Sequence, residues 1–384
     1  MNIVFFAHPS FLKSQSMMRF ASMLSSGMEE RGHKVELWSP KARFFNLPLP
    51  NFLKKWMGYI DQYIVFKLVV RKRLKACPTD TVFVFTDQAL GPWVPWVKNR
   101  KHVIHCHDFL AQRSALGQIG ENPTKWFGKQ YQAYIRNGYR SGENFISVSK
   151  KTQTDLHSFL LTKPVISRVV YNGLNPLFKP GNTIQSRMLL AAETGIDVSL
   201  GYILHIGGNQ WYKNRKGVIE IYNAFRQLDS TNLPLLLIGH KPTSELEYTR
   251  GNSAFKEDIY FLPGIEDTLL KAAYEGASAF VFPSLAEGFG WPIAEAMASG
   301  CPVITTNEAP MTEVAGEAGV LIDRQPASEE DRILWAGKAA KVLKAIVDLP
   351  VNERECIIRK GIINSNRFNL ETSLNEIEEI YKLI

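Results

Sequence analysis

Short apolar runs alternate with helix-length segments along the whole chain. Five runs fall in each half, at Ile3–Ala7, Val35–Ser39, Thr81–Phe85, His102–His105 and Asn144–Val148, and then at Tyr202–Ile206, Leu235–Gly239, Ile259–Leu262, Ala279–Phe282 and Val303–Thr305. Short β-rich runs separated by helical stretches are typical of buried parallel strands covered by helices on both faces. The pattern therefore predicts an α/β protein with two doubly wound, Rossmann-like domains.

Chain-breaking residues mark the boundary between these domains. After a strand-like run at 165–171, glycine and proline gather between residues 172 and 180, which favours a connection over a helix or strand. We assign residues 1–178 to a first domain and 179–366 to a second. The segment 367–384 is predicted to form a closing helix that packs back on the first domain. Its apolar positions share one helical stripe and are Leu374, Ile377, Ile380 and Tyr381.

Length and composition exclude a disulfide-stapled miniprotein, a collagen-like chain and a disordered chain. The 384 residues suffice for two buried cores, and 45% hydrophobic with 21% charged residues is ordinary for a globular chain. The four cysteines are scattered, which favours reduced thiols in a cytoplasmic protein. The first apolar run reads as a strand and not as a signal peptide, and no run approaches the ~20 residues of a membrane helix.

Charge is distributed unevenly along the chain. Residues 1–180 carry 26 Lys and Arg against 10 Asp and Glu, whereas residues 181–384 carry 19 against 27. Between residues 52 and 75, lysines and arginines alternate with aromatic side chains. Such a segment suits an anionic membrane surface, and a solvated helix face is the alternative. No recognition motif accompanies the charge, so no nucleic-acid partner is expected.

The most informative segment, residues 283–300, follows a predicted strand and reads PSLAEGFGWPIAEAMASG. A strand end, a glycine-flanked turn and a helix start form a junction where open α/β sheets bind ligands, and the free amides of the helix start hold anions. Glu287 and Glu295 would repel a phosphate but accept hydrogen bonds from hydroxyl groups. The segment therefore suits a ligand with both groups. Acids that merely complement a helix dipole are the alternative.

A second candidate loop, residues 207–217, reads GGNQWYKNRKG after the predicted strand Tyr202–Ile206. A glycine-rich turn that leads into a basic cluster at a helix start suits a diphosphate, on which negative charge grows when a bond to it breaks. Lys216 and Arg215 are the candidates to neutralise that charge without a metal, with Lys213 assisting. A solvated basic loop is the alternative.

Residues 283–300 resemble the E-x7-E motif of glycosyltransferase family 4, which comprises retaining enzymes of the GT-B fold. The resemblance implies two Rossmann-like domains facing a central cleft, a nucleotide-diphosphate sugar as co-substrate, and neither metal nor cofactor. It also implies that Glu287 approaches the donor sugar hydroxyls and that Glu295 approaches the donor ribose. Residues 215–217 match the family's R-K-G element, but Gly208 stands where an arginine is common and a short insertion follows, so Lys213 or Arg215 is the candidate replacement.

The same resemblance implies further contacts. The expected donor-binding residues are Arg215, Lys213, Gly207, Gly208, Gly239, Gly264, Ile265, Gly288, Phe289, Gly290 and Glu295. His107 ends a predicted strand and is followed by Asp108, like a family histidine that contacts the donor sugar. No third ligand lies nearby for a metal site, and no D-x-D motif is present to hold magnesium. The expected acceptor-side residues are Ser14, Gln15, Ser16 and Asp108.

We therefore expect a retaining, metal-independent glycosyltransferase with Glu287, His107 and Lys216 as catalytic residues. It would move a hexose-type sugar from a GDP- or UDP-linked donor to a hydroxyl of a saccharide or lipid-linked saccharide, in cell-surface polysaccharide or glycoconjugate synthesis. A cytoplasmic location, with a peripheral position at the inner face of the membrane, fits the basic first half. The alternatives are a nucleotide-sugar epimerase or phosphorylase on the same fold, and a non-catalytic protein that binds membrane or nucleic acid.

Overall fold

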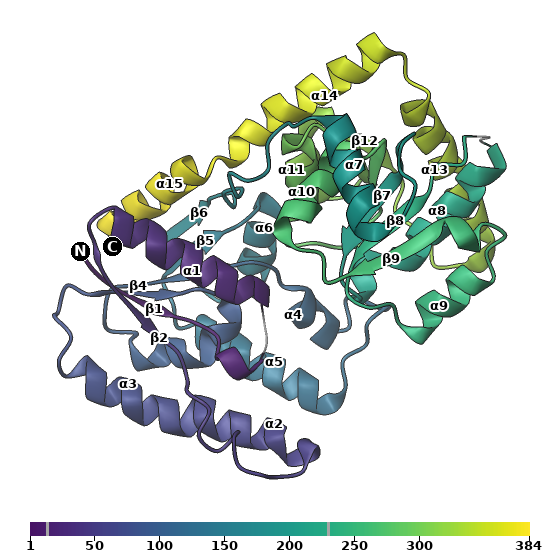
Figure 1. Cartoon of the computed structure of the whole chain (residues 1–384). Coiled ribbons are helices and arrows are strands. Elements are labelled where there is room, and N and C mark those ends of the chain that lie inside the picture. The colour runs from purple at the N-terminus through teal and green to yellow at the C-terminus, as the bar shows by residue number, and fades with distance from the viewer. Residues whose placement is uncertain (13–14, 229–230) are drawn as a thin grey trace. The chain divides into compact units, whose positions relative to one another are not determined.

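The protein consists of two compact α/β units. The computed structural model describes residues 1–12, 15–228 and 231–384. The first unit combines Met1–Tyr171 with Glu371–Ile384, and the second consists of Asn172–Leu370. Each unit is built on a parallel sheet of six strands with helices packed against it (Figure 1). The predicted fold class, two doubly wound Rossmann-like units, is confirmed.

The first unit has the strand order β2-β1-β3-β4-β5-β6. Its strands are β1 (Asn2–Phe6), β2 (Lys34–Trp38), β3 (Val82–Phe85), β4 (His102–Cys106), β5 (Asn144–Ser147) and β6 (Ile166–Val169). Its helices are α1 (Gln15–Glu30), α2 (Asn51–Ile60), α3 (Phe66–Leu74), α4 (Leu110–Ala115), α5 (Trp126–Tyr139), α6 (Lys150–Phe159) and α15 (Leu370–Leu383), with short 3₁₀ helices η1 (Ser10–Leu12) and η3 (Gln88–Trp96) and the π-helix η2 (Asp61–Val65).

The second unit has the strand order β12-β11-β10-β7-β8-β9. Its strands are β7 (Ile203–Gly207), β8 (Leu235–Gly239), β9 (Ile259–Pro263), β10 (Ala279–Phe282), β11 (Val303–Thr306) and β12 (Val320–Ile322). Its helices are α7 (Thr183–Thr194), α8 (Arg215–Leu228), α9 (Ser244–Gly251), α10 (Asp267–Gly276), α11 (Trp291–Ala298), α12 (Met311–Ala315), α13 (Glu329–Val347) and α14 (Val351–Ser365), with 3₁₀ helices η4 (Trp211–Lys213), η5 (Lys256–Asp258), η6 (Gly316–Ala318) and η7 (Asn366–Phe368).

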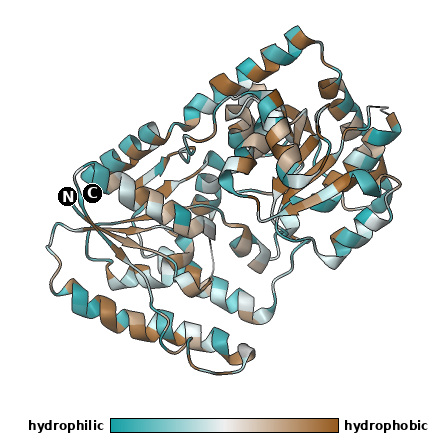
Figure 2. Cartoon of the chain, viewed as in Figure 1, coloured by the Kyte–Doolittle hydropathy of each residue, from teal (hydrophilic) through white to brown (hydrophobic). Residues whose placement is uncertain are grey.

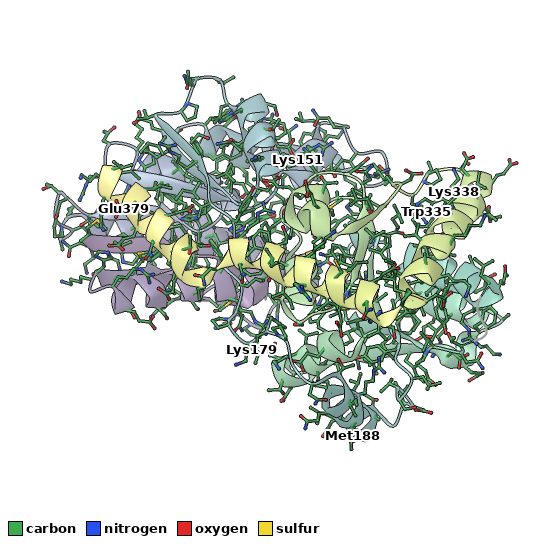
Figure 3. All side chains as sticks on the ribbon, turned by 90° about the horizontal axis from the view of Figure 1, so that it is seen from above. Lys151, Lys179, Met188, Trp335, Lys338 and Glu379 are labelled. Atoms are coloured by element: carbon green, nitrogen blue, oxygen red, sulfur yellow. The ribbon has the colours of Figure 1, made fainter. Side chains whose placement is uncertain are left out.

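The central strands form because their apolar residues are buried on both faces of each sheet. Every residue of β3, β4 and β10 is buried, and the sheets stand out as hydrophobic in Figure 2. All ten predicted runs contain a strand. The strand that the pattern missed is β12, an edge strand of three residues, because so short a run has no readable period. Helix α13 separates its faces clearly: the Trp335 indole is buried, and Lys338 is exposed (Figure 3).

Helix α15 closes the first unit. The stripe predicted from the sequence is confirmed, because Leu374, Ile377, Ile380 and Tyr381 are all buried. Leu374 packs where α1 has a glycine: a Cβ on Gly27 would lie 2.7 Å from the Leu374 side chain. The glycine therefore lets α15 lie close against α1.

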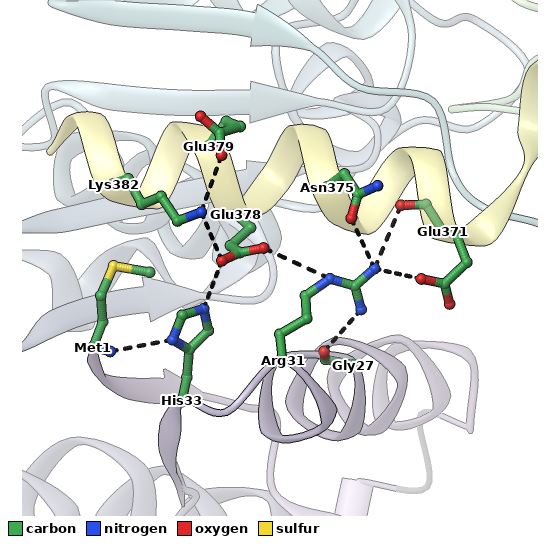
Figure 4. Close-up of polar contacts among 9 residues, drawn as sticks. All are labelled: Met1, Gly27, Arg31, His33, Glu371, Asn375, Glu378, Glu379 and Lys382. Carbon is green, nitrogen blue, oxygen red and sulfur yellow. Dashed lines mark hydrogen bonds and ion pairs between the residues drawn. The ribbon is translucent and has the colours of Figure 1, made fainter.

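Charged side chains line the contact between α15 and α1. Arg31 donates to Glu371 Oε2 at 2.6 Å and to Asn375 Oδ1 at 3.0 Å (Figure 4). His33 Nε2 lies 3.0 Å from Glu378 Oε1, which also pairs with Lys382. These polar contacts tie α15 to the segment that follows α1 and so set its register on the first unit.

The end of α15 reaches the sheet through a buried hydrogen bond. His105 Nε2 in β4 lies 2.7 Å from Tyr381 Oη, and both side chains are buried. Burial lowers the pKa of His105 to about 3, with a smaller contribution from the nearby charge of His107. His105 is therefore neutral in the folded protein at all physiological pH values.

This burial predicts a pH-dependent stability. In the unfolded chain the His105 pKa returns to about 6.5, so below that pH unfolding takes up a proton and the folded state loses stability as pH falls. We expect His105→Gln to reduce the slope of unfolding free energy against pH, between about pH 7.5 and about pH 5.5, by up to ~1.4 kcal/mol per pH unit. Urea denaturation at three pH values measures the slope. The exposed His157→Gln is the control, and an equal slope in both variants would contradict the prediction.

Candidate active site

The two loops singled out in the sequence lie at the same edge of the second sheet. Strands β7 and β10 are parallel neighbours in the register Leu204↔Phe280. The chain leaves β7 through α8 toward β8 on one side, and it leaves β10 through α11 toward β11 on the other. In open α/β sheets, ligands bind at the carboxyl ends of strands where connections diverge in this way. Residues 207–217 and 283–290 both begin there.

A buried ion pair joins the two loops. Lys213 Nζ lies 2.7 Å from Glu287 Oε1, and the side chains are only 15% and 8% exposed. Ser284 Oγ lies 2.6 Å from the same carboxylate oxygen. The structure thus places one expected cation and one expected carboxylate in direct contact, on segments that are far apart in the sequence.

Asn214 holds Lys213 in this position. Asn214 has a left-handed backbone conformation, with φ 51°, which ends the 3₁₀ helix η4 and turns the chain into α8. Its Oδ1 accepts a hydrogen bond from Gly217 N at 3.1 Å, and its Nδ2 donates to Pro283 O at 3.0 Å. One side chain therefore caps α8 and ties the first loop to the second. The sequence reasoning missed Asn214, although an asparagine directly before a helix signals such a cap.

The neighbouring cations Arg215 and Lys216 differ in position. Arg215 is buried, and its Nη1 donates to Asn209 Oδ1 at 2.6 Å and to His240 O at 3.0 Å. Burial lowers the Arg215 pKa to about 10, and within the described part of the chain its Nε and Nη2 lack hydrogen-bond partners. The Lys216 side chain is 41% exposed, and its Nζ lies 3.6 Å from Glu245 Oε1 in α9.

The two lysines therefore have different carboxylate partners. Lys213 contacts Glu287, whereas Lys216 contacts Glu245. Between the two lysines lies Asn214 with its left-handed backbone. Spacing along the sequence does not report such a turn.

The second glutamate, Glu295, lies in α11, the helix that directly follows the Glu287 loop. Helix α11 begins after Gly290, where φ is 108°, and it carries Pro292 in its first turn, as the sequence predicted. The buried Tyr274 in α10 donates through its Oη to Glu295 Oε2 at 2.9 Å. Burial, together with the Glu295 charge, raises the Tyr274 pKa, so the phenol stays protonated as a donor. Tyr274 was not foreseen, because a tyrosine in an apolar helix carries no distinguishing signal.

The expected donor-binding glycines follow the strand ends. A Cβ on Gly239, where φ is 148°, would lie 2.0 Å from Gly207 O, so only glycine allows β7 and β8 to end side by side. Gly208 and Gly288 lie in the two loops, and Gly264 follows β9 with φ 76° beside the half-buried Ile265.

Phe289 differs from the other loop positions. Its ring is buried and contacts Trp291 and Phe368. Its side chain therefore anchors the loop to the body of the second unit.

The sequence analysis also did not single out His205, a buried histidine in β7 just before residues 207–217. His205 Nδ1 donates to Val281 O at 2.9 Å, and burial lowers the His205 pKa to about 3. Its Nε2 lacks a partner among the described residues and would lie 2.9 Å from a Cβ on Gly207. The available signal was a single polar residue inside the apolar run of β7.

The candidates of the first unit are placed as follows. His107 is buried after β4, and its Nε2 donates to Thr86 O at 2.9 Å. Burial lowers the His107 pKa, so the ring is neutral and its Nδ1 is the nitrogen left for a ligand. Asp108 Oδ1 accepts a hydrogen bond from Leu110 N, the first residue of α4, at 3.0 Å.

The remaining acceptor-side candidates lie at the start of α1. Ser16 is exposed in the first turn of that helix, Gln15 is its first residue, and Ser14 lies outside the described residues. Nothing in their placement tests their expected role, which stays a prediction. Among the residues that the structure describes, no three His, Cys, Asp or Glu side chains gather in a way that could hold a metal ion.

Comparison with known proteins gives the family. The family model described as Glycosyl transferases group 1 matches residues 201–337, and the model described as Glycosyltransferase Family 4 matches residues 17–176. Together the two models match more than half of the chain.

The chain is also similar to individual proteins. O-antigen chain mannosyltransferase B of Escherichia coli is 30% identical over 186 residues, which are 48% of this chain and 46% of that protein. MMP alpha-(1->4)-mannosyltransferase of Mycolicibacterium hassiacum is 25% identical over 341 residues, 77% of this chain and 78% of that protein. The alignment thus spans less than half of the first of these relatives.

A solved structure supports the fold. The crystal structure of Anabaena Alr3699/HepE in complex with UDP and glucose superposes with a TM-score of 0.71 at 16% identity, over 99% of this chain and 98% of that one. The sequence motif around Glu287, the two matching family models and this superposition agree. The chain belongs to glycosyltransferase family 4 and has the GT-B fold.

Proposed function

We propose that this chain transfers a hexose, with retention of configuration, from a GDP- or UDP-linked donor to a hydroxyl of a saccharide or lipid-linked saccharide. Its relatives include proteins named as O-antigen mannosyltransferases and a capsular polysaccharide biosynthesis glycosyltransferase, which supports a role in cell-surface polysaccharide or glycoconjugate synthesis. A structural neighbour was solved with UDP and glucose, which supports a nucleotide-sugar donor. The observation that carries the proposal is the Lys213–Glu287 contact where β7 and β10 diverge.

The charges of the site match the parts of such a donor. The ammonium of Lys213 and the guanidinium of Arg215 would bind the diphosphate and stabilise the charge that develops on it as the sugar leaves. When phosphate oxygens take Lys213, the Glu287 carboxylate is released to accept hydrogen bonds from the sugar hydroxyls. Glu295, oriented by Tyr274, would accept hydrogen bonds from the ribose. Two cations on the diphosphate perform the electrostatic work that a divalent metal performs elsewhere.

This proposal predicts unequal effects for the two lysines. We expect Lys213→Met and Glu287→Gln each to lower kcat/KM at least ~10²-fold, because a buried electrostatic contact is lost, and the half-exposed Lys216→Met to lower it less than ~10-fold. A thermal-shift panel of UDP, GDP and ADP first identifies the nucleotide, and release of that nucleotide from its hexose donor measures the rates. A larger loss in Lys216→Met than in Lys213→Met would contradict the assignment.

Metal independence gives a second prediction. Because Lys213 and Arg215 supply the positive charge, we expect the transfer rate to stay within ~2-fold of its initial value after dialysis against EDTA. If EDTA abolishes the activity and added Mg²⁺ or Mn²⁺ restores it, this part of the proposal is wrong. The assignment of the donor site would still stand.

Peripheral contact with an anionic membrane, at the cytoplasmic face, is part of the proposal. Helices α2, η2 and α3 follow one another without a break and expose four large apolar side chains: Phe52, Trp56, Ile64 and Leu68, at 73%, 54%, 58% and 61%. Exposed basic residues accompany them, among them Lys55, Arg71 and Lys72. An exposed apolar stripe flanked by cations suits the surface of an anionic bilayer. No helix in the described ranges is both long and apolar enough to span a bilayer.

The apolar stripe predicts a lipid preference. We expect the protein to co-sediment with vesicles containing phosphatidylglycerol and much less with pure phosphatidylcholine, and the double variant Phe52→Ser with Trp56→Ser to bind at least ~10-fold more weakly, since each side chain contributes ~1.5–3 kcal/mol on burial. Leu161→Ser is the matched control, because Leu161 is 78% exposed outside these helices. Equal binding of the double variant and the control would contradict the assignment of this surface.

A further inference from the structure

A buried histidine in the second unit has a hydrogen-bond acceptor that the proposed function does not use. His205 in β7 is fully buried, and its Nε2 lacks a partner among the residues that the structure describes. Nearly all buried polar atoms in folded proteins are hydrogen-bonded, because leaving one unpaired lowers stability. The unpaired nitrogen therefore needs an explanation.

The neighbouring strand fixes the tautomer of His205. Its Nδ1 lies 2.9 Å from Val281 O in β10, and a carbonyl oxygen only accepts hydrogen bonds, so the proton lies on Nδ1. Burial, together with the charges of Arg215 and Lys213, lowers the His205 pKa to about 3, so the ring is neutral at physiological pH. Nε2 therefore carries a lone pair that can only accept a hydrogen bond.

Lys213 is the cation that lies beside this lone pair. A Cβ on Gly207 would lie 2.9 Å from His205 Nε2, 3.4 Å from Lys213 Cβ and 3.5 Å from Lys213 Cδ. Because glycine has no Cβ, no side chain stands at this point between the imidazole and the lysine. The Phe282 ring contacts both residues: it stacks on the His205 ring with the centroids 6.0 Å apart, and Lys213 Nζ lies 5.0 Å from its centroid.

The ammonium group of Lys213 can donate more hydrogen bonds than it makes. It carries three protons, and among the described residues its one hydrogen bond is to Glu287 Oε1 at 2.7 Å. In the proposed function the donor diphosphate separates this ammonium from Glu287. A mostly buried lysine that leaves its carboxylate needs other acceptors, because an uncompensated buried charge is costly. The phosphate supplies one, and His205 Nε2 can supply another.

We propose that His205 is a positioning residue for Lys213: when the donor diphosphate separates Lys213 from Glu287, the ammonium donates a hydrogen bond to His205 Nε2. This proposal rests on the proposed function. Lys213 is then held between a phosphate oxygen and the imidazole, and the Glu287 carboxylate is available to the sugar hydroxyls. The new hydrogen bond forms only in the bound state, so its free energy favours nucleotide binding and not the unliganded fold.

Nucleotide affinity tests the coupling between the two residues. The full chain is titrated with UDP and with GDP in a calorimeter, and the nucleotide that binds the wild type is used for every variant. We expect His205→Phe to raise the Kd at least ~5-fold, and His205→Gln, whose amide oxygen can still accept a hydrogen bond, to raise it less than ~2-fold. In the Lys213→Met background, where the donor is absent, His205→Phe should change the Kd less than ~2-fold.

Lys216 provides the matched control, because its ammonium contacts Glu245 and not Glu287. In the Lys216→Met background, His205→Phe should keep its full effect on the Kd. An equal effect of His205→Phe in the wild-type and Lys213→Met backgrounds, or no effect in the wild type, overturns the role of His205 and leaves the donor site standing. A wild-type chain that binds neither UDP nor GDP overturns the proposed function, and this inference with it.

The ¹⁵N chemical shift of His205 Nε2 reports the hydrogen bond directly. In protein with ¹⁵N-labelled histidine, the resonance that His205→Gln removes should have the shift of an unprotonated nitrogen, and saturating nucleotide should move it upfield. The exposed His157 gives an internal reference that should not move. A wild-type Nε2 shift that bound nucleotide leaves unchanged overturns the proposal. This measurement decides the question even if His205→Phe does not fold or Lys213→Met binds no nucleotide.

Discussion

The candidate site depends on one geometric constraint, the divergence of the chain at neighbouring parallel strands. All strands of the second sheet run the same way, so every strand delivers its carboxyl end to one edge. At β7 and β10 the following helices leave in opposite directions, which allows two loops to meet without a strand between them. Lys213 and Glu287, 74 residues apart, come into contact only because of this topology. The first sheet repeats the arrangement at β1 and β3.

The buried ion pair between Lys213 and Glu287 adds little to the stability of the fold. Removing a lysine and a glutamate from water costs free energy that their attraction in the protein roughly offsets, so a buried pair adds little net stability. Arg215 adds to this cost, since its Nε and Nη2 lack partners among the described residues. A diphosphate would supply acceptors to all of these donors. Under the proposed function, binding of the diphosphate would recover the free energy lost by burying these cations.

The sequence predicted the architecture well because buried parallel strands leave a continuous apolar signal. It predicted the Glu287 loop for a similar reason, since proline and glycine at its ends report the strand end and helix start directly. The sequence could not show which lysine contacts Glu287, because side-chain direction around the left-handed Asn214 is a property of the backbone and not of residue spacing. The contact between Tyr274 and Glu295 was not foreseen because it depends on how α10 packs against α11, which the apolar runs do not specify.

The discontinuous first unit has a consequence for synthesis. Its closing residues, Glu371–Ile384, are translated after the whole second unit, yet Tyr381 and Leu374 fill the interior beside β4 and α1. A nascent chain can therefore complete the second unit while the first still lacks part of its core. Domains that fold on the ribosome usually finish from the amino-terminal end. Here the first unit cannot finish before the second is translated, because Leu374, Ile377 and Tyr381, which complete its core, follow residues 172–370 in the chain.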